Sequence, residues 1–233
     1  MLEYILDTAD VGKIEKCFDI FPLAGVTTNP TIISREKRDF FAILRDIRAI
    51  IGPDKYLCAQ VLGETYDTIM ADADTILKAV PGPGKMSVKI PVSHAGLKAM
   101  RELARRGVSV TATAIFTPQQ ALLAAEAGAD YAAPYVNRID NISGDGVKVV
   151  KEIVQLYKVF GLPTKCLAAS FKNVQQINEC ALAGCQSVTV APDVFLKVAE
   201  HPLTDAAINQ FRNDWEAFYG KGVKPSDLKK PAE

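Results

Sequence analysis

The sequence predicts an α/β fold, a (β/α)8 TIM barrel with an extra C-terminal helix. Short β-type runs alternate with helical patterns eight times, and successive strands start roughly 20 to 33 residues apart, which is the rhythm of βα units. The chain has 233 residues, and a barrel of this kind commonly has about 250. No second block of different composition indicates another domain.

The eight predicted strands are short runs rich in β-branched and apolar residues. They cover Tyr4–Asp7, Gly25–Asn29, Leu57–Val61, Met86–Pro91, Ser109–Ile115, Tyr131–Val136, Lys165–Ala169 and Ser187–Ala191. The helical patterns between them repeat apolar residues with the helical period. They cover Val11–Ile20, Asp39–Ile51, Thr65–Ala79, Ala95–Arg106, Pro118–Ala127, Gly146–Phe160, Val174–Ala183 and Val194–Ala199.

The residues at the element ends favour the same assignment. A glycine closes a helical stretch shortly before a strand at Gly107, Gly128, Gly161 and Gly184. Pro118 stands where a first helical turn begins, and Asn173 is placed to cap the seventh helix. An open, doubly wound sheet is the alternative, but no glycine-rich phosphate loop follows the first strand.

A further helical pattern, Leu203–Tyr219, follows the eighth βα unit and is rich in aromatic residues. Its apolar face must lie on the barrel or on a neighbouring subunit. We therefore predict a single barrel domain over residues 1–220, which includes this helix. Residues 221–233 are polar and punctuated by proline, so we predict a loose tail.

The composition limits the classes of partner. Hydrophobic residues make up 48% and charged residues 23%, which is typical of a soluble globular chain. Lysine plus arginine equal aspartate plus glutamate at 27 each, so we expect no nucleic-acid partner. No apolar run reaches the roughly 20 residues that a membrane span needs, and the first residues lack the basic region of a signal peptide, so we expect no membrane association.

The cysteines and histidines indicate neither a disulfide framework nor a metal site. The five cysteines are an odd number without framework spacing, so we interpret them as reduced thiols of a cytoplasmic protein. The two histidines are His94 and His201, and the chain has no CxxC or HxxxH pair. We therefore predict no metal.

Polar side chains converge on one end of the predicted barrel. Successive side chains of a strand face opposite sides, so Ser87 and Lys89 of Met86–Pro91 point inward. The same alternation turns further polar residues inward: Asp7, Thr27, Asn29, Gln60, Thr113, Tyr135 and Ser170. It turns Ala114 and Ala169 outward. Barrel enzymes hold their sites at the C-terminal ends of the strands, where these polar residues gather.

Lys89 has the strongest functional interpretation. A buried ammonium among apolar neighbours is costly unless it is paired or loses its proton. A neutral lysine amine is a nucleophile for carbonyl carbon, which favours Schiff-base chemistry. The alternatives are a surface lysine, or a buried lysine paired with Asp7.

Several other candidates have structural alternatives. Asp7 could cap the first helix, with Thr8 or Asp10 sharing that role. The side chain of Asn29 could simply make a turn before the proline that follows it. Tyr135 could be a core aromatic residue with a satisfied hydroxyl.

A phosphate group fits the last strands of the barrel. Arg138 offers a planar fork for an oxyanion, and Lys172 adds positive charge. Ser170 precedes a helix whose free N–H groups would point to the same mouth. The alternative for Arg138 is a loop ion pair with Asp140 of little energetic value.

The chain resembles the small transaldolase family and, within it, the fructose-6-phosphate aldolase branch. The matching segments are LDTAD from Leu6, FPLAGVTTNPTII from Phe21, AQV from Ala59, VKIPVS from Val88, APYVNRID from Ala133 and LAASFKN from Leu167. The similarity covers nearly the whole chain, and TTNP together with VKIP is highly specific.

The resemblance implies a role for each candidate residue. Lys89 matches the Schiff-base lysine of the family, and Asp7 matches a carboxylate beside it. The remaining matches form three sets: the dihydroxyacetone contacts Thr27 and Asn29, the phosphate contacts Arg138 and Ser170, and the set that positions a catalytic water, Gln60, Thr113 and Tyr135. Within this last set, Tyr135 matches the acid/base.

Gln60 and Tyr135 also distinguish two branches of the family, because true transaldolases usually carry glutamate and phenylalanine there. The implied activity is a class I aldolase that cleaves or forms fructose 6-phosphate from dihydroxyacetone and glyceraldehyde 3-phosphate without a cofactor. A transaldolase that transfers a dihydroxyacetone unit between sugar phosphates is the alternative, followed by a non-catalytic sugar-phosphate-binding barrel. The resemblance also implies a homo-oligomer, commonly a decamer.

Overall fold

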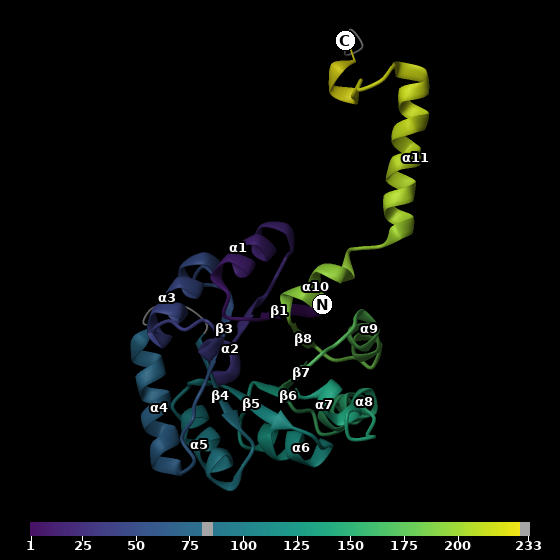
Figure 1. Ribbon diagram of the computed structural model, residues 1–233. Helices are drawn as coiled ribbons and strands as arrows, with labels where there is room; N and C mark the ends of the chain where they lie inside the picture. The colour runs from purple at the N-terminus through teal and green to yellow at the C-terminus, as the bar shows by residue number, and fades with distance from the viewer. Residues whose placement is uncertain (81–85, 229–233) are drawn as a thin grey trace, which may run out of the picture. The chain divides into compact units, whose positions relative to one another are not determined.

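The computed structural model describes residues 1–80 and 86–228. Eight parallel strands pair in chain order, and β8 pairs back to β1, so the sheet closes into a barrel (Figure 1). The strands are β1 (Glu3–Asp7), β2 (Gly25–Thr27), β3 (Tyr56–Gln60), β4 (Met86–Pro91), β5 (Ser109–Ile115), β6 (Tyr131–Pro134), β7 (Lys165–Ala168) and β8 (Ser187–Val190). The predicted (β/α)8 TIM barrel is confirmed.

Helices follow the strands around the outside of the barrel. They are α1 (Val11–Ile20), α2 (Pro30–Arg35), α3 (Phe40–Ile51), α4 (Tyr66–Ala79), α5 (His94–Arg105), α6 (Pro118–Glu126), α7 (Val136–Asp140), α8 (Gly146–Val159), α9 (Val174–Leu182) and α10 (Pro192–Phe195). Most ends lie within one or two residues of the predicted ones. The helix predicted over Val194–Ala199 is wrong, because α10 ends at Phe195 and a 3-10 turn, Leu196–Val198, follows.

Two short helices were not predicted, and each begins where a strand was predicted too long. Asn29 does not continue β2 but caps α2, accepting a hydrogen bond from the Ile32 N–H at 3.1 Å, with Pro30 in the first turn. Tyr135 likewise ends the extended segment of β6 and is the N-cap of α7. Both turns place a polar side chain at the mouth of the barrel.

The residues predicted to start and end helices have the expected conformations. Asn173 caps α9 through its side-chain oxygen, which accepts from the Gln176 N–H at 2.9 Å. Each helix-closing glycine has a positive φ, a conformation that favours glycine: Gly107, Gly128, Gly161 and Gly184.

The interior of the barrel holds an apolar cluster, Ile5, Tyr56, Cys58, Ala133, Leu167 and Ala169, which reaches the cavity at Ala169. A buried polar chain crosses this layer, since the Thr111 hydroxyl bonds to both the Tyr56 hydroxyl and the Ser87 hydroxyl. Because these polar groups satisfy one another, the layer can stay dry and rigid. The layer lies next to the C-terminal ends of the strands and supports the polar side chains there.

The chain divides into two compact units, Met1–Phe195 and Leu196–Glu233. The second unit contains α11 (Pro202–Tyr219), which buries none of its residues and exposes Leu203, Ile208, Phe211 and Phe218. The predicted C-terminal helix is therefore present. That residues 1–220 form one domain stays a prediction.

The predicted tail is partly ordered within the second unit. The Trp215 indole stacks on Tyr219 at 4.1 Å between ring centroids and donates a hydrogen bond to the Val223 carbonyl at 2.9 Å. A 3-10 turn, Pro225–Asp227, follows. Residues 229–233 of the predicted tail lie outside the described residues. Across residues 1–80 and 86–228, no helix is both long enough and apolar enough to cross a bilayer.

Candidate active site

A cavity of about 330 Å³ opens at the C-terminal ends of the strands. Most of the predicted site residues line it: Asp7, Asn29, Gln60, Lys89, Tyr135, Arg138 and Ser170. The other two, Thr27 and Thr113, are fully buried and bond to residues of the lining. The closed sheet therefore brings the whole predicted set together from strands and loops distributed along the chain.

Lys89 lies at the base of this cavity with 3% of its surface exposed. Its Nζ donates to the Thr28 backbone carbonyl at 3.4 Å. Among the described residues it forms no ion pair, with Asp7 or with any other carboxylate. Lys89 is thus neither a surface lysine nor a salt-bridged one, and its amine is directed to a cavity that a carbonyl compound can enter.

Asp7 is held by a chain of two threonine hydroxyls, from Thr27 and Thr189, at the edge of the cavity. Its Oδ1 accepts a hydrogen bond from the Thr27 hydroxyl at 2.8 Å, and the Thr27 oxygen lies 2.6 Å from the Thr189 hydroxyl. Since the single Thr27 proton goes to Asp7, Thr189 must donate to Thr27. The side chain that caps α1 is Asp10, not Asp7. Asp7 is therefore left to face the cavity as a positioned carboxylate.

Three contacts fix the orientation of the Tyr135 side chain. Its hydroxyl bonds to the Thr113 hydroxyl at 2.9 Å, and Phe116 packs edge-on against its ring at 5.7 Å between centroids. The Arg138 guanidinium lies over the same ring, 4.8 Å from its centroid. The phenol is thus aimed into the cavity, where a proton donor or acceptor would act.

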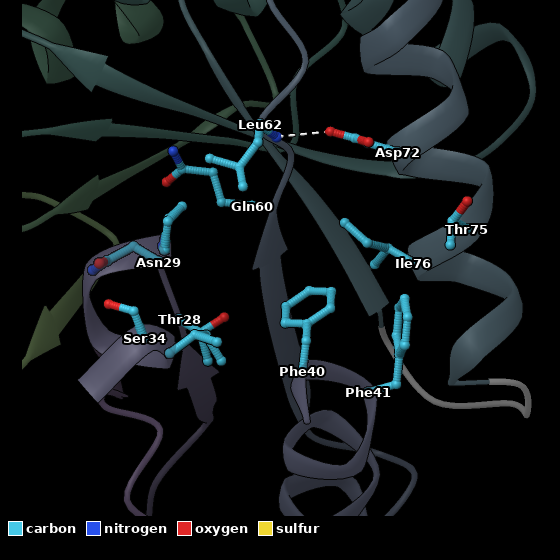
Figure 2. Close-up of a pocket in the computed structure, with 12 residues that line it drawn as sticks. Thr28, Asn29, Ser34, Phe40, Phe41, Gln60, Leu62, Asp72, Thr75 and Ile76 are labelled. Carbon is cyan, nitrogen blue, oxygen red and sulfur yellow. Dashed lines mark hydrogen bonds between the residues drawn. The ribbon is translucent and has the colours of Figure 1, made fainter. Parts of the chain in front are cut away.

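Gln60 lines both this cavity and a second, larger one of about 490 Å³, as do Asn29 and Pro30. Figure 2 shows the second cavity, in which Asn29 and Gln60 turn their amides away from Phe40 and Phe41. The Gln60 Oε1 is buried and has no hydrogen-bond partner among the described residues. A buried amide oxygen without a partner is unusual in a folded protein, so Gln60 is marked out among the residues that line the cavity.

The strand alternation was wrong for two alanines, Ala114 and Ala169, which line the cavity instead of facing outward. Ala114 has a φ of 55° in an irregular stretch of the β5–β6 pairing, so the alternation breaks there. Ser170 has a φ of 64°, so Ala169 and Ser170 both reach the cavity where the chain leaves β7. Both positions depend on backbone geometry that a period-two pattern does not predict.

Three further lining residues, Pro30, Thr31 and Thr189, were missed. The alternation of Ser187–Ala191 would have found Thr189, because it shares the inward face with Ser187. Thr31 gives no such signal, since its position depends on α2, which is too short for a periodic pattern.

The predicted phosphate residues Arg138 and Ser170 both line the cavity and come from segments that backbone hydrogen bonds join, but not every predicted contribution holds. Arg138 makes no ion pair with Asp140, whose carboxylate instead accepts from the Gly146 N–H and the Gln176 amide. The helix after Ser170 begins only at Val174. Lys172 does not line the cavity, so the positive charge expected from its side chain stays a prediction. Among the lining residues, the anion prediction depends on Arg138 and Ser170.

The donor set of the cavity suits a polyhydroxylated anion. Hydroxyls, amides, one carboxylate, one amine and one guanidinium face it, which are groups that bind sugar hydroxyls and phosphate. Within residues 1–80 and 86–228, no three His, Cys, Asp or Glu side chains gather as a metal-binding group.

The closed (β/α)8 barrel carries an enclosed lysine at the C-terminal ends of its strands, which is the end where barrel enzymes hold their sites. The comparisons with known proteins identify the class. The chain belongs to the Transaldolase/Fructose-6-phosphate aldolase family, whose model matches residues 4–224.

Individual relatives agree with this assignment. The chain is 41% identical over 215 residues to a probable fructose-6-phosphate aldolase of Streptococcus pneumoniae (strain ATCC 700669 / Spain 23F-1), covering 92% of this chain and 96% of that protein. Among solved structures, it resembles a chain of a designed cube-shaped, porous protein cage with a TM-score of 0.57 and 15% identity, over 95% of this chain and 79% of the other. The latter likeness supports the fold alone.

Proposed function

We propose that this protein is a class I aldolase that cleaves or forms fructose 6-phosphate from dihydroxyacetone and glyceraldehyde 3-phosphate. The observation that carries the proposal is the enclosed Lys89 amine, which no described carboxylate pairs and which faces a cavity rich in hydrogen-bonding groups. The name of the Streptococcus relative supports the same substrate.

The reaction begins with attack of the Lys89 amine on the C2 carbonyl of the ketose. Loss of water gives an iminium ion. The C3–C4 bond then breaks, and its electron pair moves into the iminium to form an enamine, while the C4 hydroxyl proton passes to Tyr135, directly or through a water held by Gln60 and Thr113. Glyceraldehyde 3-phosphate leaves. Tyr135 then returns this proton to C3 of the enamine, and hydrolysis of the imine by water releases dihydroxyacetone and restores both Lys89 and Tyr135.

The other lining residues bind and orient the substrate. Asp7 accepts hydrogen bonds from hydroxyls near the lysine, with Thr27 holding its carboxylate. Asn29 uses its carbonyl oxygen to cap α2, so its amide nitrogen is the group that binds the dihydroxyacetone portion. Arg138 and Ser170 bind the phosphate group at the far side of the cavity.

Transaldolase activity is the second candidate, because the family includes both activities. Gln60 and Tyr135 favour the aldolase. A tyrosine hydroxyl and a water bound to an amide can complete imine hydrolysis, whereas a transaldolase must preserve its enamine until an acceptor aldehyde arrives. A non-catalytic barrel that only binds sugar phosphates is the least favoured candidate, because it would not need Lys89, Asp7 and Tyr135 in one cavity.

Incubation with fructose 6-phosphate alone separates the candidates. The aldolase releases free dihydroxyacetone in the absence of an acceptor. Turnover only after erythrose 4-phosphate is added would favour the transaldolase, and binding without any turnover would favour the non-catalytic barrel.

We also propose a cytoplasmic homo-oligomer that needs no metal or organic cofactor and no nucleic-acid or membrane partner. The exposed apolar residues of α11, Leu203, Ile208, Phe211 and Phe218, support association between copies, since such side chains are usually covered. A decamer is the expected size from the family resemblance. Mass measurement in solution tests it, and a monomer at micromolar concentration would contradict the proposal.

A further inference from the structure

We propose that a hydrogen-bonded bridge between the buried Gln176 and the half-buried Asp140 positions the phosphate-binding residues and so determines the preference for phosphorylated acceptors. We call Arg138 and Ser170 the anion arm. The inference rests on the proposed function, because it assigns the bridge a role in binding the phosphate of that substrate.

The two residues of the anion arm come from different segments that must be held together. Arg138 lies on α7, and Ser170 lies in the loop between β7 and α9. Two backbone hydrogen bonds join these segments, from the Val136 N–H to the Ala169 carbonyl and from the Asn137 N–H to the Ser170 carbonyl, each 2.9 Å long. They fix the start of α7, but the exposed Arg138 side chain extends beyond them.

The bridge fixes the other end of α7. The Gln176 Nε2 donates to the Asp140 Oδ2 at 2.7 Å, and the Asp140 Oδ1 accepts from the Gly146 N–H at 2.8 Å. The Gln176 Oε1 accepts from the Lys172 N–H at 2.9 Å, in the loop that follows Ser170. One buried side chain thus ties the end of α7 to the loop of Ser170.

Each partner of the bridge requires a specific chemistry. Asp140 can only accept when ionised, and the Lys172 N–H can only donate, so the amide of Gln176 satisfies both and a carboxylate at 176 cannot. Gly146 is equally constrained, because an added Cβ would lie 2.5 Å from the Val136 carbonyl oxygen. The contacts place α7 in one position, and Gln176 and Asp140 are therefore positioning residues for Arg138 and Ser170.

The test compares glyceraldehyde 3-phosphate with glyceraldehyde as acceptors for dihydroxyacetone. In Gln176→Glu, two carboxylates oppose each other, and kcat/KM for the phosphorylated acceptor should fall about tenfold through KM, while that for glyceraldehyde stays within about twofold. The double variant Asp140→Asn/Gln176→Glu restores all three hydrogen bonds at unchanged net charge: only the bond between residues 140 and 176 reverses its direction, and the Gly146 and Lys172 N–H groups still donate. It should return to within about threefold of the wild type.

Matched variants separate positioning from general destabilisation. Gln175→Leu alters the neighbouring exposed glutamine, whose amide bonds to Glu179, and should change neither acceptor. Asp140→Asn alone should give a smaller selective loss than Gln176→Glu, and it provides the test if Gln176→Glu does not fold.

Three results would overturn the inference. They are equal losses for both acceptors, no loss for either, and a double variant as impaired as Gln176→Glu. A wild type that does not discriminate between the two acceptors would refute the phosphate role of Arg138 in the proposed function, and the inference with it. Release of dihydroxyacetone from fructose 6-phosphate alone would still test the aldolase separately.

Discussion

Replacing Thr27 with valine tests the hydroxyl chain at the edge of the cavity. Thr27 has no exposed surface, and its hydroxyl bonds to Asp7 at 2.8 Å and to Thr189 at 2.6 Å. Valine has nearly the same volume, so the change removes hydrogen bonds without opening a cavity. The loss of a bond to a carboxylate and of the Thr189 acceptor should lower the free energy of unfolding by about 2 kcal/mol.

This loss corresponds to a melting temperature lowered by about 4–8 °C for a chain of this size. Thermal unfolding followed by circular dichroism measures it. Thr75→Val on the exposed surface of α4 is the matched control and should change the free energy of unfolding by at most about 0.5 kcal/mol. A fall in Thr27→Val no larger than in this control would contradict the reasoning.

The same variant distinguishes two roles for Thr27 in the reaction. If Thr27 acts through Asp7, kcat should fall in Thr27→Val, and the double variant with Asp7→Asn should be little worse than Asp7→Asn alone. If Thr27 contacts the substrate, KM should rise alone and the two changes should add. Steady-state kinetics of the four proteins decide between these roles, and the buried position of Thr27 predicts the first.

Three further predictions concern the orientation of Tyr135, the carboxylate of Glu3 and the cysteine thiols. Thr113→Val removes the 2.9 Å hydrogen bond that orients the Tyr135 hydroxyl. Because such a bond contributes about 1 kcal/mol, kcat should fall about fivefold, and an unchanged kcat would argue against this role of Thr113. Burial acts to raise the pKa of Glu3, but hydrogen bonds from Lys165, Ser187 and Tyr131 outweigh it and hold the pKa below its ordinary value of 4.5. The ionised Glu3 therefore stabilises the fold fully above about pH 4.5, and this stabilisation is lost as the pH falls through the lowered pKa. In Glu3→Gln, the free energy of unfolding measured with urea should therefore decrease less between neutral and acidic pH than in the wild type. Burial raises the pKa of the Cys166 thiol and raises that of Cys185 to about 12. All five buried cysteines should thus react with an aromatic disulfide only after unfolding, and rapid labelling of the native protein would contradict this.

The sequence predicts the barrel and most of the site because both depend on local periodicity. Lys89, Gln60 and Thr113 lie in or at the end of regular strands, where alternation fixes the side of the sheet that each residue faces. Inward polar residues at strand ends then indicate a site. The prediction was wrong at Ala114 and Ala169, where positive φ angles at Ala114 and Ser170 end the alternation.

The rest of the site depends on long-range contacts. Helices α2 and α7 are too short to carry a periodic signal, and their N-cap residues, Asn29 and Tyr135, were assigned to strands. Asp140 meets Gln176 across 36 positions of the chain, and Thr27 meets Thr189 across 162. No local pattern encodes such pairs, because they form only when the barrel closes.

Covalent trapping at Lys89 tests the central claim most directly. The wild-type protein is incubated with fructose 6-phosphate and borohydride, and its peptides are analysed by mass spectrometry. We predict one reduced three-carbon adduct, on the Lys89 peptide, and neither adduct nor turnover in Lys89→Met with an unchanged melting profile. An adduct on another lysine, or normal turnover by Lys89→Met, would contradict the account.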